Sequence, residues 1–404
     1  MATDVSAVRR WSMLVIALGS TMCANVFING AAFLIPTLHG ERGLDLSRAG
    51  LVSAMPSFGM VLTLIAWGWV VDRVGERFVL TVGALLTSLA AFAAAWADSL
   101  VAVGAFLLLG GMAAASSNSA SGRLVVGWFP PEQRGLVMGI RQTAQPLGVG
   151  LGALVIPRVA ESSGVSAALL FPAIACLVAA VVTALGVIDP PRPPRSSAPA
   201  TDLANPYRGS SALARIHAVS VLLVVPQSLV WTFSLVWLMT AHGWSAGAAG
   251  AMVTVAQLCG AAGRIAAGRW SDVMGSRLHP VRVIAVLAGV TMGLLALTDY
   301  LHWPVAVFVM VVASVVTVTD NGLSFTAIAE IAGPFWSGRA LGVQNTTQLL
   351  TAGIVPPVFG ALIGAFGFPA AFAVCALFPV LAVPLVPVAA DPLRAKPVPA
   401  PAEH

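Results

Sequence analysis

The sequence has little charge, and this shortage already narrows the class of protein. Only 9% of the 404 residues are Asp, Glu, Lys or Arg, whereas soluble domains average about 25%. Hydrophobic residues make up 58% of the chain, and its mean hydropathy is +0.90. A soluble fold of this size could not bury so much apolar surface, so we expect a lipid bilayer around most of the chain. Secreted or cytosolic enzymes, nucleic-acid-binding proteins and disordered scaffolds are excluded.

Cysteine is also scarce, and the common catalytic motifs are missing. The four cysteines, Cys23, Cys176, Cys259 and Cys375, lie inside apolar runs and lack the spacing of metal ligands. The sequence contains no G-x-S-x-G, H-E-x-x-H or G-x-x-x-x-G-K-[ST] motif. We therefore expect no enzymatic activity, no cofactor, no metal and no nucleotide site. An ion gradient or a solute gradient must supply the energy for any work that the protein does.

Long apolar runs dominate the rest of the chain, and they predict an all-α membrane protein. A helix needs about 20 apolar residues to cross a bilayer. Twelve runs meet this requirement, at residues 11–38, 46–71, 78–97, 99–128, 135–160, 165–188, 213–241, 246–270, 281–299, 303–329, 338–365 and 368–388.

One long polar break divides these twelve spans into two groups of six. Residues 189–212 are rich in proline and polar side chains, which predicts a linker rather than a span. We expect an N-terminal six-helix bundle over 1–188 and a C-terminal one over 213–390. The tail, 391–404, has the same composition as the linker and is predicted to be disordered.

The basic residues predict the orientation of the chain in the membrane. With both termini and the linker assigned to the cytoplasm, that side carries 15 Arg and Lys residues and the opposite side three. Such an excess follows the positive-inside rule, so both termini are expected in the cytoplasm of a bacterial cell with the spans in its inner membrane. We expect a monomer that does not bind nucleic acid.

The two halves of the sequence repeat each other. The pattern G-x3-D-x2-G-x-R begins at Gly68 and again at Gly268, 200 residues later. Further along the offset becomes 203, where Asn118 matches Asn321 and a stretch from Gly139 matches one from Gly342. Duplicated bundles of this kind are typical of transporters whose halves rock around a site near the middle of the membrane.

The first copy of that pattern resembles a family signature. Gly68-x3-Asp72-Arg73-x-Gly75-x-Arg77 is similar to the loop motif G-x-x-x-D-R-x-G-R-[RK] of the major facilitator superfamily. The resemblance covers nearly the whole chain and implies that family's fold, with two pseudo-symmetric six-helix bundles and alternating access. The turn from Trp128 to Gly139 resembles the organic-anion and cyanate-permease-like branches, whereas the span 4 and span 5 signatures of the drug antiporters are missing or poorly kept.

The loop motif predicts a gate. Asp72 stands at the predicted cytoplasmic end of its span, where it can accept hydrogen bonds from Arg77 or from the start of another helix. The contacts of such a latch would form in one conformational state and break in the other. The alternative is a charge patch that only sets membrane orientation. The predicted gating residues are Gly68, Asp72, Arg73, Gly75, Arg77, Arg264 and Asp272.

Polar residues inside the spans predict the substrate site, because ionisable groups at membrane depth are costly. Arg141, Gln145, Gly148 and Gly152 would share one face of a continuous fifth span. Asp320, the one acid well inside a span, is the predicted proton carrier; the alternative is an ion-pair partner of an arginine. The predicted substrate-binding residues are Arg141, Gln145, Asn25, Asn29, Asn118, Gln227, Trp231, Asn321, Gln344 and Gln348. Two other charged residues are predicted to lie outside the site. Arg123 should reach the cytoplasmic surface, and Glu330 should be solvated.

These residues favour one substrate class over others. Three arginines but one aspartate lie within the spans, so a cavity reached by two of those arginines would attract anions. Arg141 could hold a carboxylate through two parallel hydrogen bonds; the alternative is a structural arginine that ties the fifth span to a helix end. The sequence therefore predicts a secondary transporter that imports a small organic anion with protons. The alternatives are proton-coupled efflux of a drug or metabolite and a transporter-like sensor without net flux.

Overall fold

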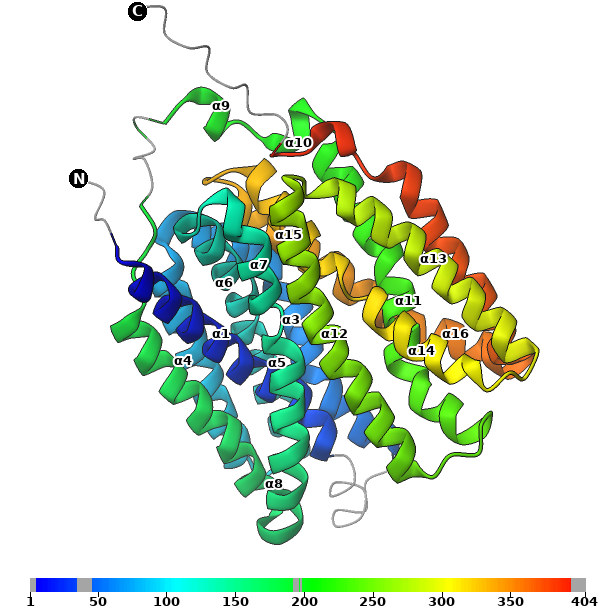
Figure 1. Ribbon diagram of the computed structural model, residues 1–404. Helices are drawn as coiled ribbons and strands as arrows, with labels where there is room; N and C mark the ends of the chain where they lie inside the picture. Colours follow the sequence, from blue (N-terminus) through cyan, green and yellow to red (C-terminus); the bar gives the residue numbers. More distant parts are fainter. Residues whose placement is uncertain (1–4, 35–45, 192–195, 197, 394–404) are drawn as a thin grey trace, which may run out of the picture. The chain divides into compact units, whose positions relative to one another are not determined.

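The computed structural model describes residues 5–34, 46–191, 196 and 198–393, and every regular element in these ranges is a helix (Figure 1). The elements of the first half are α1 (Ala7–Gly30), η1 (Ala31–Leu34), α3 (Leu46–Val74), α4 (Glu76–Ala95), α5 (Leu100–Ala114), α6 (Ser116–Trp128), α7 (Pro131–Arg141) and α8 (Ala144–Gly186). Those that follow are α9 (Ala200–Leu203), α10 (Pro206–Gly209), α11 (Ala212–Thr240), α12 (Ala246–Met274), α13 (Leu278–Tyr300), α14 (Val305–Val316), α15 (Asp320–Ala332), α16 (Ser337–Ala382), η2 (Val383–Leu385) and η3 (Val388–Ala390).

The described helices can account for twelve membrane crossings. Ten stretches are long and apolar enough to span a bilayer. Two of them, 56 and 49 residues long, would extend roughly 84 and 74 Å as straight helices, against a hydrocarbon core of ~30 Å. Each turns back at a glycine, Gly164 or Gly367, whose φ is +82° or +79°. Dividing the two stretches there gives the twelve spans that the sequence predicts.

Three spans are interrupted close to predicted site residues. The fourth passes from α5 to α6 at Ala115, three residues before Asn118. The tenth is broken between Val316 and Asp320. The fifth is broken between Arg141 and Ala144. Broken helices at membrane depth are tolerated where they are buried in protein or line a cavity, and many transporters build their binding sites from them.

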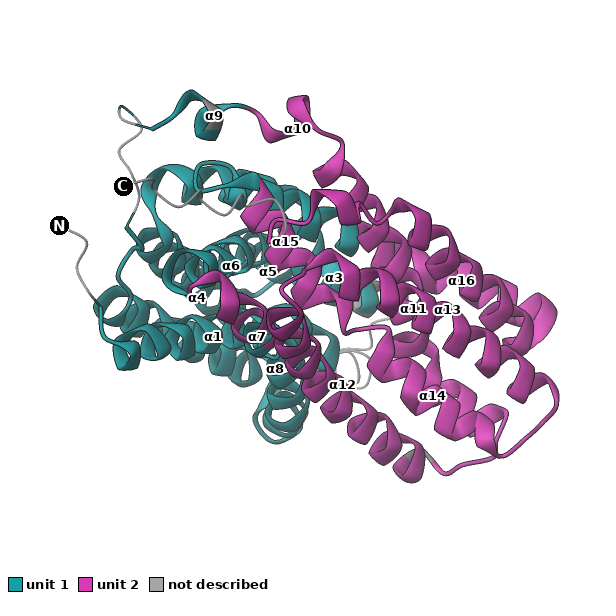
Figure 2. Cartoon of the chain, turned by 45° about the horizontal axis from the view of Figure 1, so that its top comes forward, with its two compact units in different colours: residues 1–129, 140–204, 332–349 teal, residues 130–139, 205–331, 350–404 magenta. Residues whose placement is uncertain are grey.

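The chain forms two compact units, and their boundaries do not follow chain order (Figure 2). Unit 1 comprises residues 1–129, 140–204 and 332–349, and unit 2 comprises 130–139, 205–331 and 350–404. Residues 332–349, at the start of α16, therefore belong with the N-terminal helices. Residues 130–139, at the start of α7, belong with the C-terminal ones. The predicted gate residues Asp72 and Asp272 each contact one of these two short segments.

Each unit has an apolar core of its own. In unit 1, Phe27, Leu107 and Leu169 are buried in one cluster contributed by α1, α5 and α8. In unit 2, Leu229 and Phe372 are buried in a second cluster contributed by α11, α13, α14 and α16. Many other large apolar side chains are exposed, as expected for helices whose outer surface meets lipid.

The segments after the sixth and twelfth spans each place an aspartate at a helix start. In the predicted linker, Asp189 accepts a hydrogen bond from the Arg77 amide at the start of α4 (2.8 Å). Asp391, the first residue of the predicted disordered tail, is buried and accepts from the Leu278 amide at the start of α13 (2.8 Å). It also accepts from the Ser276 hydroxyl (2.6 Å). Residues 394–404 of that tail lie outside the described residues.

The backbone at the two turn glycines gives a test of the fold. Because φ near +80° with ψ near 170° is a region that only glycine adopts readily, Gly164→Ala should destabilise the protein by about 1–3 kcal/mol. Gly353→Ala, at an open helical position of α16, is the matched control and should be neutral or slightly stabilising. Thermal unfolding in detergent measures both, and equal melting temperatures for the two variants would contradict the prediction.

Candidate functional site

Asp72 is the centre of a polar cluster in unit 1 that we term the first latch (Asp72, Arg123, Gly338 and Arg339). The carboxylate is buried in the last turn of α3 and accepts the backbone amides of Gly338 (2.8 Å) and Arg339 (3.1 Å). It also pairs with the side chains of Arg339 (3.0 Å) and Arg123 (2.8 Å). A carboxylate at the start of α16 is favoured by the amide groups and by the helix dipole.

Two glycines permit this close approach. The backbones of Gly68 and Gly338 lie so near each other that a Cβ on either would collide with the other's carbonyl oxygen. A side chain on either residue would therefore push α16 away from α3. This explains why the motif begins with glycine four residues before Asp72. The sequence-based expectation that Asp72 meets the start of another helix agrees with this geometry.

Arg123 was expected at the surface, and that expectation is wrong. Its side chain is 4% exposed and lies between Asp72 and Glu76, whose Oε1 is 3.3 Å from Arg123 Nε. It also donates to the carbonyl oxygens of Val71 and Pro334. The position of Arg123 along its helix predicts its depth in the membrane but not these partners. One signal was available: Glu76 stands where the family motif has a basic residue, and a buried acid needs a buried cation.

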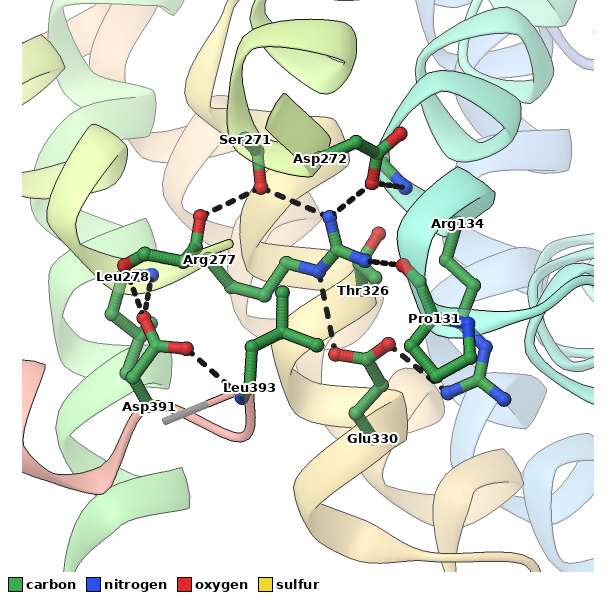
Figure 3. Close-up of polar contacts among 12 residues, drawn as sticks. Pro131, Arg134, Ser271, Asp272, Arg277, Leu278, Thr326, Glu330, Asp391 and Leu393 are labelled. Carbon is green, nitrogen blue, oxygen red and sulfur yellow. Dashed lines mark hydrogen bonds and ion pairs between the residues drawn. The ribbon is translucent and has the colours of Figure 1, made fainter. Parts of the chain in front are cut away.

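Asp272 forms the corresponding cluster in unit 2, the second latch (Asp272, Gly135, Leu136 and Arg277), shown in Figure 3. Its carboxylate accepts the amides of Gly135 (2.9 Å) and Leu136 (2.8 Å) near the start of α7. Arg277 pairs with it at 2.5 Å. Gly68 and Gly338 have their counterparts here in Gly268 and Gly135, which pack backbone to backbone in the same way.

Glu330 also belongs to this cluster, and the expectation that it is solvated is wrong. Its side chain is 5% exposed and pairs with Arg134 at 3.0 Å and with Arg277 at 3.4 Å (Figure 3). A buried glutamate between two arginines has its charge neutralised, and together they hold the end of α15 to the start of α7.

Three arginines of the predicted gate, Arg73, Arg77 and Arg264, lie outside both latches. Arg77 does not reach Asp72; its guanidinium donates to the Ala184 carbonyl oxygen on α8 (2.6 and 2.9 Å). Arg73 is exposed and stacks on the Trp69 ring, 3.8 Å from its centroid. Gly75 is the N-cap residue of α4 and lies next to the Asp189 carboxylate, with which a Cβ would collide.

Arg141 is buried in unit 1, where it ties the end of α7 to α6. Its guanidinium donates to the Ser121 hydroxyl (3.0 Å), the Asn118 carbonyl oxygen (2.7 Å) and the Gln142 side chain (2.7 Å). The predicted stripe through Gln145 is wrong. Because the helix breaks at Gln142 and Thr143, Arg141 is buried while Gln145 is exposed.

The other predicted polar residues of unit 1 lie on three elements. On α1, Asn25 and Asn29 donate to carbonyl oxygens one turn earlier in their own helix. Asn118 Nδ2 lies 3.6 Å from the Met60 sulfur. On α16, Gln344 is buried and Gln348 is half-buried.

In unit 2, the remaining predicted residues come together. Asp320 begins α15 and is 1% exposed, and Arg264 on α12 donates from Nε to the carbonyl oxygen of Val318, two residues before Asp320 (3.4 Å). The Arg264 guanidinium carbon is 5.8 Å from the centroid of the Trp231 ring on α11. Asn321 donates to Gln227 Oε1 at 2.9 Å. A carboxyl, a guanidinium, an aromatic ring and an amide pair thus gather from α11, α12 and α15, which is chemistry suited to binding a proton and an anion.

No resident metal is indicated by the described side chains. Within residues 5–34, 46–191 and 198–393, no group of three His, Cys, Asp or Glu residues is placed to hold an ion. All four cysteines are free thiols.

Comparison with known proteins gives the family of the chain. The sequence model of the Major Facilitator Superfamily matches residues 15–356 and, in a second match, 220–404. A protein described as an uncharacterized MFS-type transporter of Mycobacterium tuberculosis is 57% identical over 389 residues, 96% of this chain and 87% of the relative. The solved structure of the proton:xylose symporter XylE superposes with a TM-score of 0.76 at 16% identity, covering 94% of this chain and 95% of that one.

Two more distant relatives carry a substrate in their names. The probable galactarate/D-glucarate transporter of Bacillus subtilis is 22% identical over 367 residues, 82% of this chain and 80% of that protein. The 4-hydroxybenzoate transporter of Pseudomonas putida is 27% identical over 156 residues, 37% of this chain and 35% of its own.

Each latch can be tested by the exchange of the amides that it holds. Asp72→Ala removes the acceptor of the Gly338 and Arg339 amides, so hydrogen exchange there should rise by about tenfold or more, because a lost charge-assisted hydrogen bond costs roughly 1.5–3 kcal/mol. Asp272→Ala should do the same for Gly135 and Leu136.

Each variant is the control for the other. Hydrogen–deuterium exchange with peptide-level mass spectrometry should show faster exchange at the start of α16 in the first variant and at the start of α7 in the second. Unchanged protection in both would mean that the carboxylates do not hold these helix starts.

Proposed function

Since the chain belongs to the major facilitator superfamily and is a secondary transporter rather than an enzyme, we propose that it imports a small carboxylate-bearing anion together with protons. The observation that carries this proposal is the cluster in unit 2. There a buried arginine, Arg264, contacts the carbonyl oxygen two residues before a buried acid, Asp320, and an aromatic ring and an amide pair lie on α11 and α15. Ionisable groups at membrane depth are rare, and those that occur usually lie on ion or substrate pathways.

The names of the distant relatives support the same substrate class. Galactarate, D-glucarate and 4-hydroxybenzoate all carry carboxylate groups, and the first two also carry several hydroxyls. An arginine binds a carboxylate through two parallel hydrogen bonds. In unit 2, Arg264 is proposed to meet the anion, and the amides of Gln227 and Asn321 are proposed to bind its remaining polar groups. In unit 1, Arg141, Asn25, Asn29, Asn118, Gln344 and Gln348 stay predicted substrate contacts.

The latches give the proposed transport cycle its two states. Both carboxylates hold helix starts with several charge-assisted hydrogen bonds, and these must break together for α16 and α7 to leave α3 and α12. We propose that the latched state is closed to the cytoplasm and that both termini lie on that side of a bacterial inner membrane. The positive-inside distribution of arginine supports this orientation. The working unit in this proposal is a monomer.

A transport assay tests the proposal directly. Purified protein in liposomes loaded with a pH-sensitive dye would receive a panel of small carboxylates, including 4-hydroxybenzoate and D-glucarate, and then a panel of lipophilic cations. Proton entry driven by a carboxylate is the expected result. Proton release driven by cations would replace this proposal with efflux. No change of the dye signal with either panel would favour a sensor.

Arg141→Ala is the first variant to examine in that assay. Loss of one partner of a buried charged contact costs about 2–5 kcal/mol, so uptake of the active carboxylate should fall by at least about tenfold. Arg158→Ala is the matched control and should leave uptake unchanged, because this arginine is exposed and, among the described residues, bonds within its own helix. Equal uptake in both variants would remove Arg141 from the site.

A further inference from the structure

A polar cluster lies at the end of unit 2 where α11 and α13 finish. The Asp299 carboxylate, 7% exposed in the last turn of α13, accepts a hydrogen bond from the Trp237 indole Nε1 at 2.9 Å. His242, in the loop after α11, packs edge to face against the same indole, with 4.3 Å between the ring centroids. Its Nε2 lies 3.7 Å from Asp299 Oδ1. Side chains from two helices and a loop thus meet around one buried acid.

The contacts within this cluster are incomplete. His242 Nε2 is buried, and among the described residues it has no hydrogen-bond partner. It lies within ion-pair distance of Asp299 but too far away for a hydrogen bond. Asp299 receives a bond from the neutral indole, and no arginine or lysine of the described chain pairs with it. A buried carboxylate without a cation and a buried nitrogen without a partner are both costly, and one added proton would satisfy both.

The surroundings leave His242 as the partner for that proton. Trp237 is fully buried in an apolar cluster that also holds residues of α12, α14 and α16. These helices carry no acidic or basic side chain in residues 246–258, 305–316 and 363–375. Tyr300 and His302 follow Asp299 along the chain, and both are exposed, so water screens their charge.

We propose that His242 and Asp299 form a proton-binding clasp that responds to the pH of the compartment facing this end of the protein. Histidine is the side chain whose charge changes between about pH 5 and 8. When a proton adds to the imidazole, Nε2–H can donate to Asp299 Oδ1, and the pair becomes an ion pair without net charge. When the proton leaves, the pair is negative and the imidazole no longer holds the carboxylate.

Protonation strengthens the clasp, and rising pH weakens it. The ion pair forms in the folded protein but not in the unfolded chain. It therefore adds stability at acid pH, and this stability is lost as the pH rises through the range in which the imidazole gives up its proton.

The clasp acts on a helix that also carries a residue of the candidate site. Trp237 follows Trp231 by six residues on α11, which is about 9 Å by helical rise. Because Asp299 holds Trp237 and His242 together, the protonated clasp fixes the end of α11 to α13. In the proposed orientation this end faces the outside, so external acid would hold α11 in place. This regulatory step rests on the proposed function above, whereas the clasp itself does not.

Histidine NMR tests the clasp without any substrate. In the full-length protein, isotope-labelled at its six histidines, the His242 signal is identified by its absence from His242→Gln. His242 should lose its proton at a higher pH in the wild type than in Asp299→Asn, because the asparagine Oδ1 can still accept the indole bond but carries no charge. Loss of the proton at the same pH in both proteins would overturn the clasp.

Thermal melting in detergent at about pH 5.5 and about pH 8 is an independent readout. The melting temperature of the wild type should fall relative to that of His242→Gln as the pH rises. The double variant His242→Gln/Asp299→Asn should show coupling between the two residues at the acid pH alone, and additive effects at both pH values would contradict the inference. If Asp299→Asn does not fold, the comparison of the wild type with His242→Gln still decides.

The control for the melting experiment is a histidine at the other end of the same helix. His279→Gln removes a half-buried histidine at the start of α13, far along the helix from Asp299. Its melting temperature should follow that of the wild type at both pH values.

Counterflow of 4-hydroxybenzoate, with equal pH on both sides of the membrane, tests the regulatory step. Exchange requires passage between the two states, so at acid pH the wild type should exchange more slowly than His242→Gln by at least about fivefold, a usual size for coupling between sites. Identical pH profiles would overturn the regulation. If no carboxylate of the panel moves protons, the proposed function falls with its regulation, and the NMR and melting results still decide whether the clasp exists.

Discussion

A buried carboxylate that accepts the first amides of a helix from the other half of the sequence is the interaction on which this structure depends. Asp72 holds the start of α16 and Asp272 holds the start of α7. Amide donors and an arginine together repay the loss of water around each carboxylate, so the aspartate is stable only while the helix stays in place. The glycines at these crossings let the backbones come close enough. This is why each compact unit includes a short segment from the opposite half of the sequence.

The two latches share a geometry but not a set of charges. In the first, the buried arginine and second acid are Arg123 and Glu76, whose counterparts in the repeat are Thr326 and Ser276. In the second, they are Arg277 and Glu330, whose counterparts are Arg77 and Gly127. In both halves, a buried arginine and a second acid accompany the aspartate, but they come from different positions of the repeat. The two clusters can therefore differ in strength, although their helices are arranged alike.

Much of the fold was predictable from the sequence, because span length, the offset repeat and the glycine–aspartate motif all act locally. The twelve spans and the meeting of Asp72 with a helix start follow from such local signals. The partners of Arg123 and Glu330 did not, because position along a helix fixes depth in the membrane but not the neighbour across the interface. The stripe through Arg141 and Gln145 failed for another reason: the helix breaks at Gln142 and Thr143 without a glycine or proline to mark the break.

The aspartates that follow each half's last helix determine what the linker and the tail do for the fold. Asp189 and Asp391 stand 202 residues apart, each is followed by proline, and each receives an amide from the start of its own half's third long helix. The first residues of the linker and of the tail thus make equivalent contacts within their own halves. A chain shortened before either aspartate would lose the acceptor at that helix start, so these two positions mark where each half ends as a folded unit.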